Sequence, residues 1–139
     1  MIEIKKVLEL EDSDYYETHL SLINCIIPKD HRMTPMEIKV LATFMSLQGD
    51  IAEIRFGTSG RKIVMNTLNI SAQGLSGYIG TLLDKKLIVG RGDKTTILPL
   101  LIPERSKQDY RFRLKNNTFI KHESDSKTNM LSEASVLQQ

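Results

Sequence analysis

The residues of this chain most able to do chemistry are its lysines and arginines, and they are concentrated in one segment. Residues 55–116 contain twelve Lys or Arg and four Asp or Glu, a net charge of +8, whereas residues 1–54 contain five and ten, a net charge of −5. Clustered cations attract polyanions such as nucleic acid, and complementary charged surfaces can also join subunits. The pattern favours a polyanion partner or a charge-matched oligomer. The simpler alternative is a solvated face that happens to be basic.

Side chains that could support catalysis or hold a metal are scattered. Cys25 lies in the apolar run INCII, where we expect a small buried hydrophobe, and His19 has no Ser or Cys nearby that would suggest a triad. The carboxylates of residues 9–17 have no spacing that would hold an acid/base pair. The segment GTSGRK at 57–62 lacks the spacing of a phosphate loop. The sequence therefore predicts a protein that is not an enzyme and that has neither a metal site nor a cofactor.

The length of 139 residues predicts one domain, and the 40% hydrophobic and 26% charged residues are ordinary for a globular protein. The sequence contains no run of 18 apolar residues, so it predicts no membrane-spanning helix. Charges interrupt the apolar residues of the N-terminus, MIEIKKVLELED, so we expect no secretory signal there. One cysteine cannot form an internal disulfide. We expect a cytoplasmic or nucleoid-associated protein.

Two helices are expected before the basic segment. Apolar residues recur at helical spacing over 13–27, with Ser13 as a candidate cap and Pro28 as the stop. Residues 34–48 begin with Thr34-Pro35-Met36-Glu37, which is typical of a capping box with proline at the first helical position. An apolar stripe follows, and Gly49 is a suitable end.

Two more helices and several strands follow. The spacing predicts helices over 61–68, capped by Thr58 or Ser59, and over 72–86, capped by Ser71, with Asn69 in the turn. Their expected inward side chains are Ile63, Val64, Leu68, Leu75, Ile79 and Leu82. Short strands are expected at 87–89 and 95–102 around a turn at 90–94, and a third at 110–115 with one apolar and one basic face. The expected fold class is α+β, mostly α.

The sequence resembles the winged helix-turn-helix family. The run TLNISAQGLSGYIGTLLDKKLI is similar to the core of such domains, and the preceding TPMEIKVLATFM is similar to the helix that opens MarR-type regulators. The resemblance covers about residues 34–102. It implies a three-helix core with a β-hairpin wing, a DNA-binding function in transcription regulation, and a second helix that enters the major groove.

The resemblance and the basic charge together indicate which residues could contact DNA. Outward residues of the second helix would face the groove, while cations of the preceding helix and the wing would reach phosphates. These residues are Arg61, Lys62, Ser71, Gln73, Gly74, Ser76, Gly77, Thr81, Lys85, Arg91 and Lys94.

Three glycines on the outward side of helix 72–86 complicate this interpretation. Gly74, Gly77 and Gly80 each cost about 1 kcal/mol of helix stability relative to alanine and remove side chains that could read bases. A glycine face permits close approach, either to DNA or to another helix. The alternative function is therefore a structural or adaptor subunit of a larger assembly, for example a phage or virion component, and its location would then be the virion.

The domain organisation follows from these elements. We expect an N-terminal arm and helix at 1–33, a winged helix-turn-helix domain at 34–116 and a polar tail at 117–139. Because a single small module contacts little DNA, we expect a homodimer on double-stranded DNA, with residues 1–33 supplying subunit contacts. The tail carries Met130, Leu131, Val136 and Leu137, which could dock on a protein partner.

Overall fold

The computed structural model describes residues 7–104, 107–118 and 135–138 of the chain. It forms two compact units, residues 1–102 and residues 103–139, and each is described by itself. The described residues are mostly helical, with two small antiparallel sheets of two strands each. The predicted α+β, mostly α class is thereby confirmed. None of the helices in the described ranges has the length and apolarity needed to span a bilayer.

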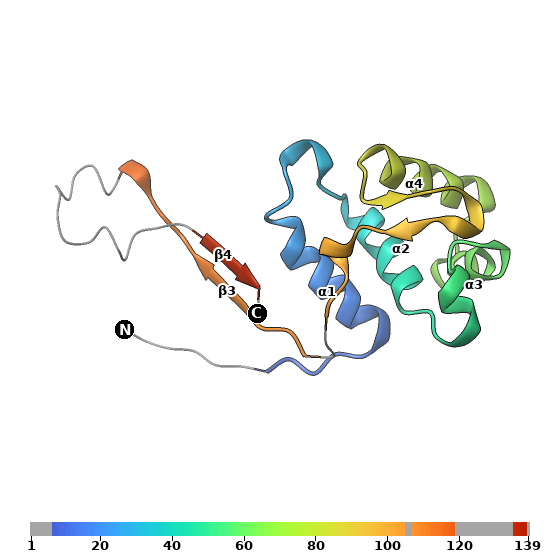
Figure 1. Cartoon of the computed structure of the whole chain (residues 1–139), viewed down its shortest axis with the longest axis horizontal. Coiled ribbons are helices and arrows are strands. Elements are labelled where there is room, and N and C mark those ends of the chain that lie inside the picture. The colour runs from blue at the N-terminus through green and yellow to red at the C-terminus, as the bar shows by residue number, and fades with distance from the viewer. Residues whose placement is uncertain (1–6, 105–106, 119–134, 139) are drawn as a thin grey trace. The chain divides into compact units, whose positions relative to one another are not determined.

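The central element of the first unit is α2 (Pro35–Met45), which has α1 on one side and α3 and α4 on the other (Figure 1). Its predicted capping box is confirmed: the Glu37 amide donates to Thr34 Oγ1 over 3.3 Å, and the Thr34 amide donates to Glu37 Oε1 over 2.7 Å. The predicted single apolar stripe is too narrow, because Val40, Thr43 and Phe44 are also buried. A helix with neighbours on several sides must bury most of its surface.

The helix α2 ends three residues before the predicted end at Gln48. Ser46 Oγ donates to the Thr43 carbonyl over 2.7 Å, and Arg55 Nη1 donates to the carbonyls of Phe44 and Met45 over 3.0 and 3.2 Å. These side chains satisfy carbonyls that another helical turn would have used. The ring of Phe44 stacks on that of Phe56 with centroids 4.4 Å apart.

The helix α1 (Asp12–Asn24) buries Leu20 and Ile23 against α2, as its spacing predicts, but the expected cap at Ser13 and the expected burial of Cys25 are wrong. Ser13 is not the cap, because the helix starts one residue earlier, after Glu11. His19 is buried, with 2% of its surface exposed, and its Nε2 donates to the Leu101 carbonyl over 3.0 Å. Cys25 is exposed, because the helix ends at Asn24 and the thiol turns back to the Ser21 carbonyl.

The 3-10 helix η2 (Gly49–Ile54) leads into α3 (Thr58–Leu68), which begins earlier than predicted. Neither Thr58 nor Ser59 caps it, because Gly57 occupies the cap position without a side-chain bond. A Cβ built on Gly60 would lie 1.8 Å from the Arg55 carbonyl oxygen. This close approach lets the first turn of α3 pass directly over the preceding backbone.

The helix α4 (Ala72–Asp84) follows a three-residue turn, and the hairpin of β1 (Ile88–Val89) and β2 (Thr96–Ile97) follows α4. Leu75, Ile79 and Leu82 are buried as predicted. Ile63 of α3 was expected inside but is 37% exposed. The predicted strand 95–102 is shorter, because Pro99 has no amide hydrogen to pair and instead starts the 3-10 helix η4 (Pro99–Leu101).

The second unit contains β3 (Tyr110–Arg113), which pairs antiparallel with β4 (Ser135–Gln138). The register places Arg111 opposite Leu137 and Phe112 opposite Val136. The predicted strand 110–115 is therefore present in shortened form. Its partner strand comes from residues 117–139, the segment predicted to be a polar tail. Met130 and Leu131 lie outside the described residues.

Candidate nucleic-acid interface

The turn between α3 and α4 is fixed by local hydrogen bonds. Asn69 adopts the left-handed conformation with φ of 53°, which ends α3, and the Ile70 amide donates to the Met65 carbonyl over 3.1 Å. The Ser71 hydroxyl accepts from the Gly74 amide over 3.0 Å, so it caps α4 as predicted. These bonds hold the start of α4 in place after α3.

The outward side of α4 is small and weakly polar. Gln73, Ser76 and Gly77 are exposed, and we name these three residues the α4 outer face. Thr81 is half-buried and its hydroxyl donates to the Gly77 carbonyl over 2.9 Å. The two side chains of the α4 outer face that carry hydrogen-bonding groups are therefore Gln73 and Ser76.

The glycines of α4 are not required by the packing of this chain. A Cβ built on Gly77 or Gly80 meets no described atom within 4 Å, and one built on Gly74 meets only Ser71 Oγ, at 3.2 Å. Each glycine still costs about 1 kcal/mol of helix stability relative to alanine. The described residues give no packing reason for glycine at Gly77 and Gly80.

Two of the predicted cationic contacts are occupied within the fold. Lys85 Nζ lies 2.5 Å from Glu37 Oε1, and the Lys85 side chain is only 19% exposed. Arg61 is half-buried and its Nε donates to the Phe56 carbonyl over 2.7 Å. Lys85 therefore joins α4 to α2, and Arg61 holds the start of α3. Lys62, Lys86, Arg91 and Lys94 are the exposed cations of the α3–α4–hairpin region.

The Lys85–Glu37 pair sits within a larger set of bonds. His31 Nδ1 donates to the Lys85 carbonyl over 2.8 Å, so the end of α4 is bound at both its backbone and its side chain. Burial alone would raise the pKa of Glu37, but the hydrogen bonds from Lys85 and Thr34 together hold its pKa below the ordinary value of 4.5. Glu37 is thus ionised at neutral pH although only 2% of it is exposed.

The loop of the β1–β2 hairpin presents Arg91 and Lys94 on a constrained backbone. Gly90 has φ of +110°, and a Cβ there would lie 2.5 Å from the Lys94 carbonyl oxygen, so only glycine fits this turn. Asp93 Oδ1 lies 2.9 Å from the position of a Cβ on Gly57, which places this loop against the start of α3. The helix start and the two cations are therefore held near each other.

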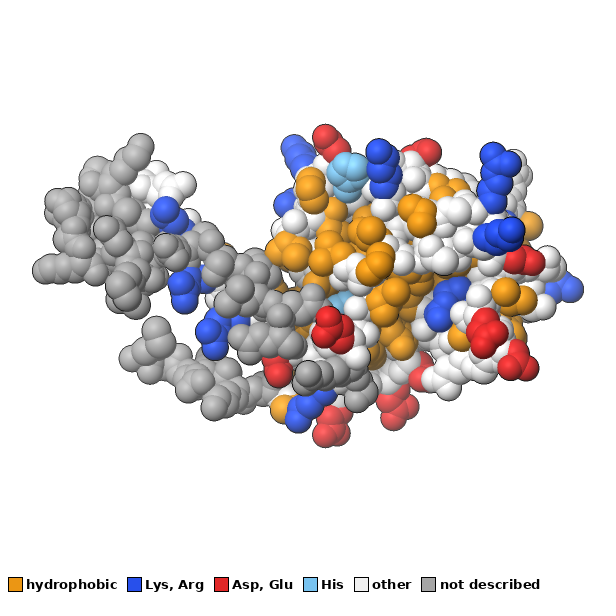
Figure 2. All heavy atoms as spheres, in the orientation of Figure 1, with side chains coloured by type: hydrophobic (Ala, Val, Ile, Leu, Met, Phe, Trp, Pro, Cys, Tyr) orange, Lys and Arg blue, Asp and Glu red, His pale blue; other side chains and the backbone are white. Residues whose placement is uncertain are grey.

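Figure 2 shows one face of the first unit. On it the Lys and Arg side chains stand apart from one another, mostly along the rim, while hydrophobic side chains occupy the middle.

No protein-family model, curated protein or solved structure matches this chain.

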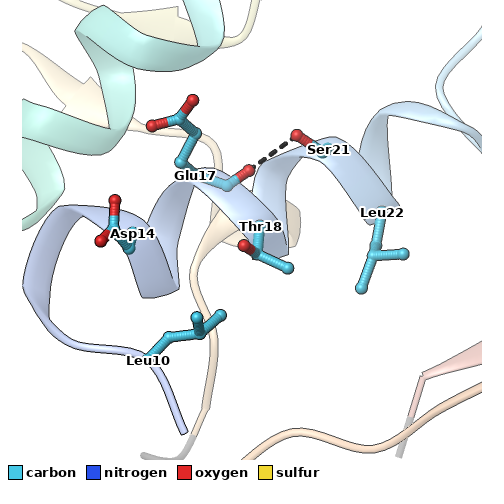
Figure 3. A pocket seen from close by; sticks show the side chains of 6 residues that line it. All are labelled: Leu10, Asp14, Glu17, Thr18, Ser21 and Leu22. Carbon is cyan, nitrogen blue, oxygen red and sulfur yellow. Dashed lines mark hydrogen bonds between the residues drawn. The ribbon is translucent and has the colours of Figure 1, made fainter. Parts of the chain in front are cut away.

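A hollow of about 390 Å3 lies along α1. Leu10, Thr18 and Leu22 are directed to one side of the helix, whereas the Glu17 carboxylate points away from them (Figure 3). Ser21 Oγ donates to the Glu17 carbonyl over 2.8 Å, so this hydroxyl is bound to its own helix. Within the described ranges, no group of three or more His, Cys, Asp or Glu is placed to hold a metal ion.

The sequence did not indicate the residues that fix the packing of the helices around the candidate interface, although it indicated the exposed residues of that interface. Arg55 closes the end of α2, Gly60 permits the approach of α3, and His19 ties α1 to the segment after the hairpin. The one signal available was the pair of glycines, Gly57 and Gly60, around the predicted start of α3. Nothing in the sequence near His19 indicates that it would meet a carbonyl 82 residues away.

Proposed function

We propose that this chain is a DNA-binding winged-helix protein that acts as a transcriptional regulator. The observation that carries the proposal is the order of three packed helices, α2, α3 and α4, followed by the β1–β2 hairpin, with the α4 outer face and two hairpin-loop cations exposed. In this reading α4 enters the major groove and the hairpin is the wing.

The chemistry of each exposed side chain indicates its role in DNA binding. Gln73 is the candidate reader of a base, because its amide can bond adenine at two positions, and Ser76 is the second candidate. Lys62, Lys86, Arg91 and Lys94 are the candidate phosphate contacts. Gly77 lets the α4 backbone approach the duplex closely. With two short polar side chains facing the groove, we expect moderate sequence preference and a large electrostatic contribution to affinity.

The test is fluorescence anisotropy with a labelled random duplex over a series of salt concentrations. Four phosphate contacts per protomer predict a slope of roughly −4 in log K against log salt concentration. Arg91→Gln/Lys94→Gln should lower the slope magnitude by about 2. The matched control is Lys29→Gln/Lys39→Gln, which removes two exposed charges outside the candidate interface. Wild-type protein that does not bind at low salt contradicts the proposal.

A second candidate function is favoured by the open glycines. Because Gly77 and Gly80 have no neighbour that would exclude a side chain, their cost is explained if another protein surface packs closely on α4. In this reading the chain is a non-enzymatic structural or adaptor subunit, and its association resists salt. Gly77→Leu should then abolish a salt-resistant complex in light scattering, whereas Gly77→Ala should preserve it. A complex unaffected by Gly77→Leu contradicts the adaptor function.

A further inference from the structure

We propose that the two-stranded ribbon of β3 and β4, together with Lys115 two residues beyond β3, is a second duplex-DNA contact, in which Arg111 and Lys115 bind phosphates. The inference rests on the proposed function, because it takes the same duplex as the ligand. It concerns the second unit alone and adds a contact that neither α4 nor the hairpin supplies.

Each face of β3 carries one exposed side chain. Successive residues of a strand point to opposite faces, so Tyr110 and Phe112 lie on one face of β3 and Arg111 and Arg113 on the other. Phe112 is 45% exposed, and Arg111 is exposed on the opposite face. The sheet has two strands. A two-stranded ribbon is marginally stable on its own in water, so contact of β3 with a surface would stabilise it.

The second step is the charge. Residues 107–118 contain Lys107, Arg111, Arg113 and Lys115 against one carboxylate, Asp109, a net charge of +3. Lys107, Arg111 and Lys115 are exposed. Arg111 in β3 and Lys107 and Lys115 on either side of the strand form an exposed basic stretch, which is complementary to a row of phosphates.

The third step is the shape. A two-stranded antiparallel ribbon has the width that the major groove of B-DNA admits, and strands are used by several classes of DNA-binding protein. The face of β3 that carries Arg111 is the one that would lie against the phosphates, because Phe112 points to the opposite face. Because the two units are covalently joined, binding through one raises the effective concentration of the other.

The experiment compares two double variants of the full chain in the anisotropy titration. Arg111→Gln/Lys115→Gln removes the two ribbon cations, and Arg91→Gln/Lys94→Gln removes the two hairpin cations. We expect the ribbon variant to lower the slope magnitude by about 2 and to weaken binding by roughly tenfold or more at 100 mM salt. The charge-preserving variant Arg111→Lys/Lys115→Arg should keep the wild-type slope, which separates charge from folding of the ribbon.

The possible results distinguish the two proposals. If only the hairpin variant changes the slope and the ribbon variant matches Lys29→Gln/Lys39→Gln, the ribbon inference is wrong and the proposed function stands. If only the ribbon variant changes it, the ribbon binds DNA and the assignment of α4 and the hairpin fails. Wild-type protein that does not bind overturns both.

A second copy of this chain is the alternative occupant of the ribbon. Residues 7–28 carry five carboxylates and no Lys or Arg, so they could attract the ribbon of another copy. Light scattering of the same variants tests this. A wild-type dimer that Arg111→Gln/Lys115→Gln converts to monomer, with an unchanged DNA slope, overturns the DNA assignment.

Discussion

Lys85 Nζ lies 2.5 Å from Glu37 Oε1 and thereby joins the end of α4 to the first turn of α2. The same carboxylate oxygen accepts from the Thr34 amide, so one group both caps α2 and binds α4. Sequence reasoning placed Lys85 on the DNA and Glu37 in a local capping box. The structure makes the pair a long-range contact that fixes the orientation of α4.

We predict that Lys85→Met destabilises the fold by roughly 2–3 kcal/mol, because it leaves the buried Glu37 carboxylate without its cation. The matched control is Lys86→Met, which removes an exposed charge and should change the free energy of unfolding by less than about 0.5 kcal/mol. Urea unfolding of both variants measures the difference. Equal stabilities of the two variants would show that the Lys85–Glu37 contact contributes little.

The pH dependence of stability should have a component from Glu37. The pKa of Glu37 is lowered in the folded chain, so the pair stabilises the fold above the unfolded value of about 4.5. That stability is lost as the pH falls through the folded pKa, because the carboxylate must then take up a proton. Glu37→Gln should flatten the unfolding profile below pH 4.5. A profile identical to that of the wild type contradicts this assignment.

His19 should act in a separate and higher pH window. Burial lowers the pKa of His19, and its hydrogen bond to the Leu101 carbonyl only partly opposes this. As the pH falls below about 6.5, the unfolded chain takes up a proton that the folded chain resists, so stability falls by up to about 1.4 kcal/mol per pH unit. His19→Gln keeps a donor but does not titrate. In thermal unfolding between pH 7 and 5, the melting temperature of this variant should fall less steeply with decreasing pH than that of the wild type.

The same substitution should have opposite effects at two glycines. Gly60→Ala places a Cβ 1.8 Å from the Arg55 carbonyl oxygen and should destabilise by about 2 kcal/mol or more. Gly77→Ala enters open space on α4 and should stabilise by about 0.5–1 kcal/mol. Chemical denaturation of the two variants measures the change in the free energy of unfolding that each substitution causes. A destabilised Gly77→Ala would mean that the α4 outer face is not open in solution.

Gln73 should determine base preference without determining the salt dependence. We predict that Gln73→Ala lowers affinity for a selected site by about 1–3 kcal/mol and leaves binding to random duplex nearly unchanged. Arg91→Gln/Lys94→Gln should instead weaken binding to both duplexes alike. Site selection followed by competition titrations separates the two effects. Equal losses of Gln73→Ala on both duplexes would exclude Gln73 as a base reader.

Some local features of the fold were predictable, because they depend on residues a few positions apart, although the expected caps at Ser13 and at Thr58 or Ser59 were wrong. The capping box at Thr34 and Glu37, the left-handed turn at Asn69 and the cap at Ser71 all follow from short-range hydrogen bonding. The buried positions of α4 follow from its apolar spacing. These features define the order of elements in the candidate interface.

The remaining features depend on contacts between distant segments. Lys85 meets Glu37 48 residues away, and His19 meets Leu101 82 residues away. Tertiary packing decides such pairs, and neither sequence spacing nor residue type indicates them. The pairing of β3 with β4 was missed for the same reason, since its partner strand lies in a polar segment with few apolar residues.

The exposure of Cys25 has a practical consequence for the experiments above. It is the one cysteine of the chain, and it lies outside the candidate interface. A maleimide dye can therefore be attached at one defined place without mutagenesis, and its fluorescence can then follow binding. Under oxidising conditions the same thiol can link two chains covalently, so a dimer in light scattering counts as an assembly only when it persists in the presence of a reducing agent.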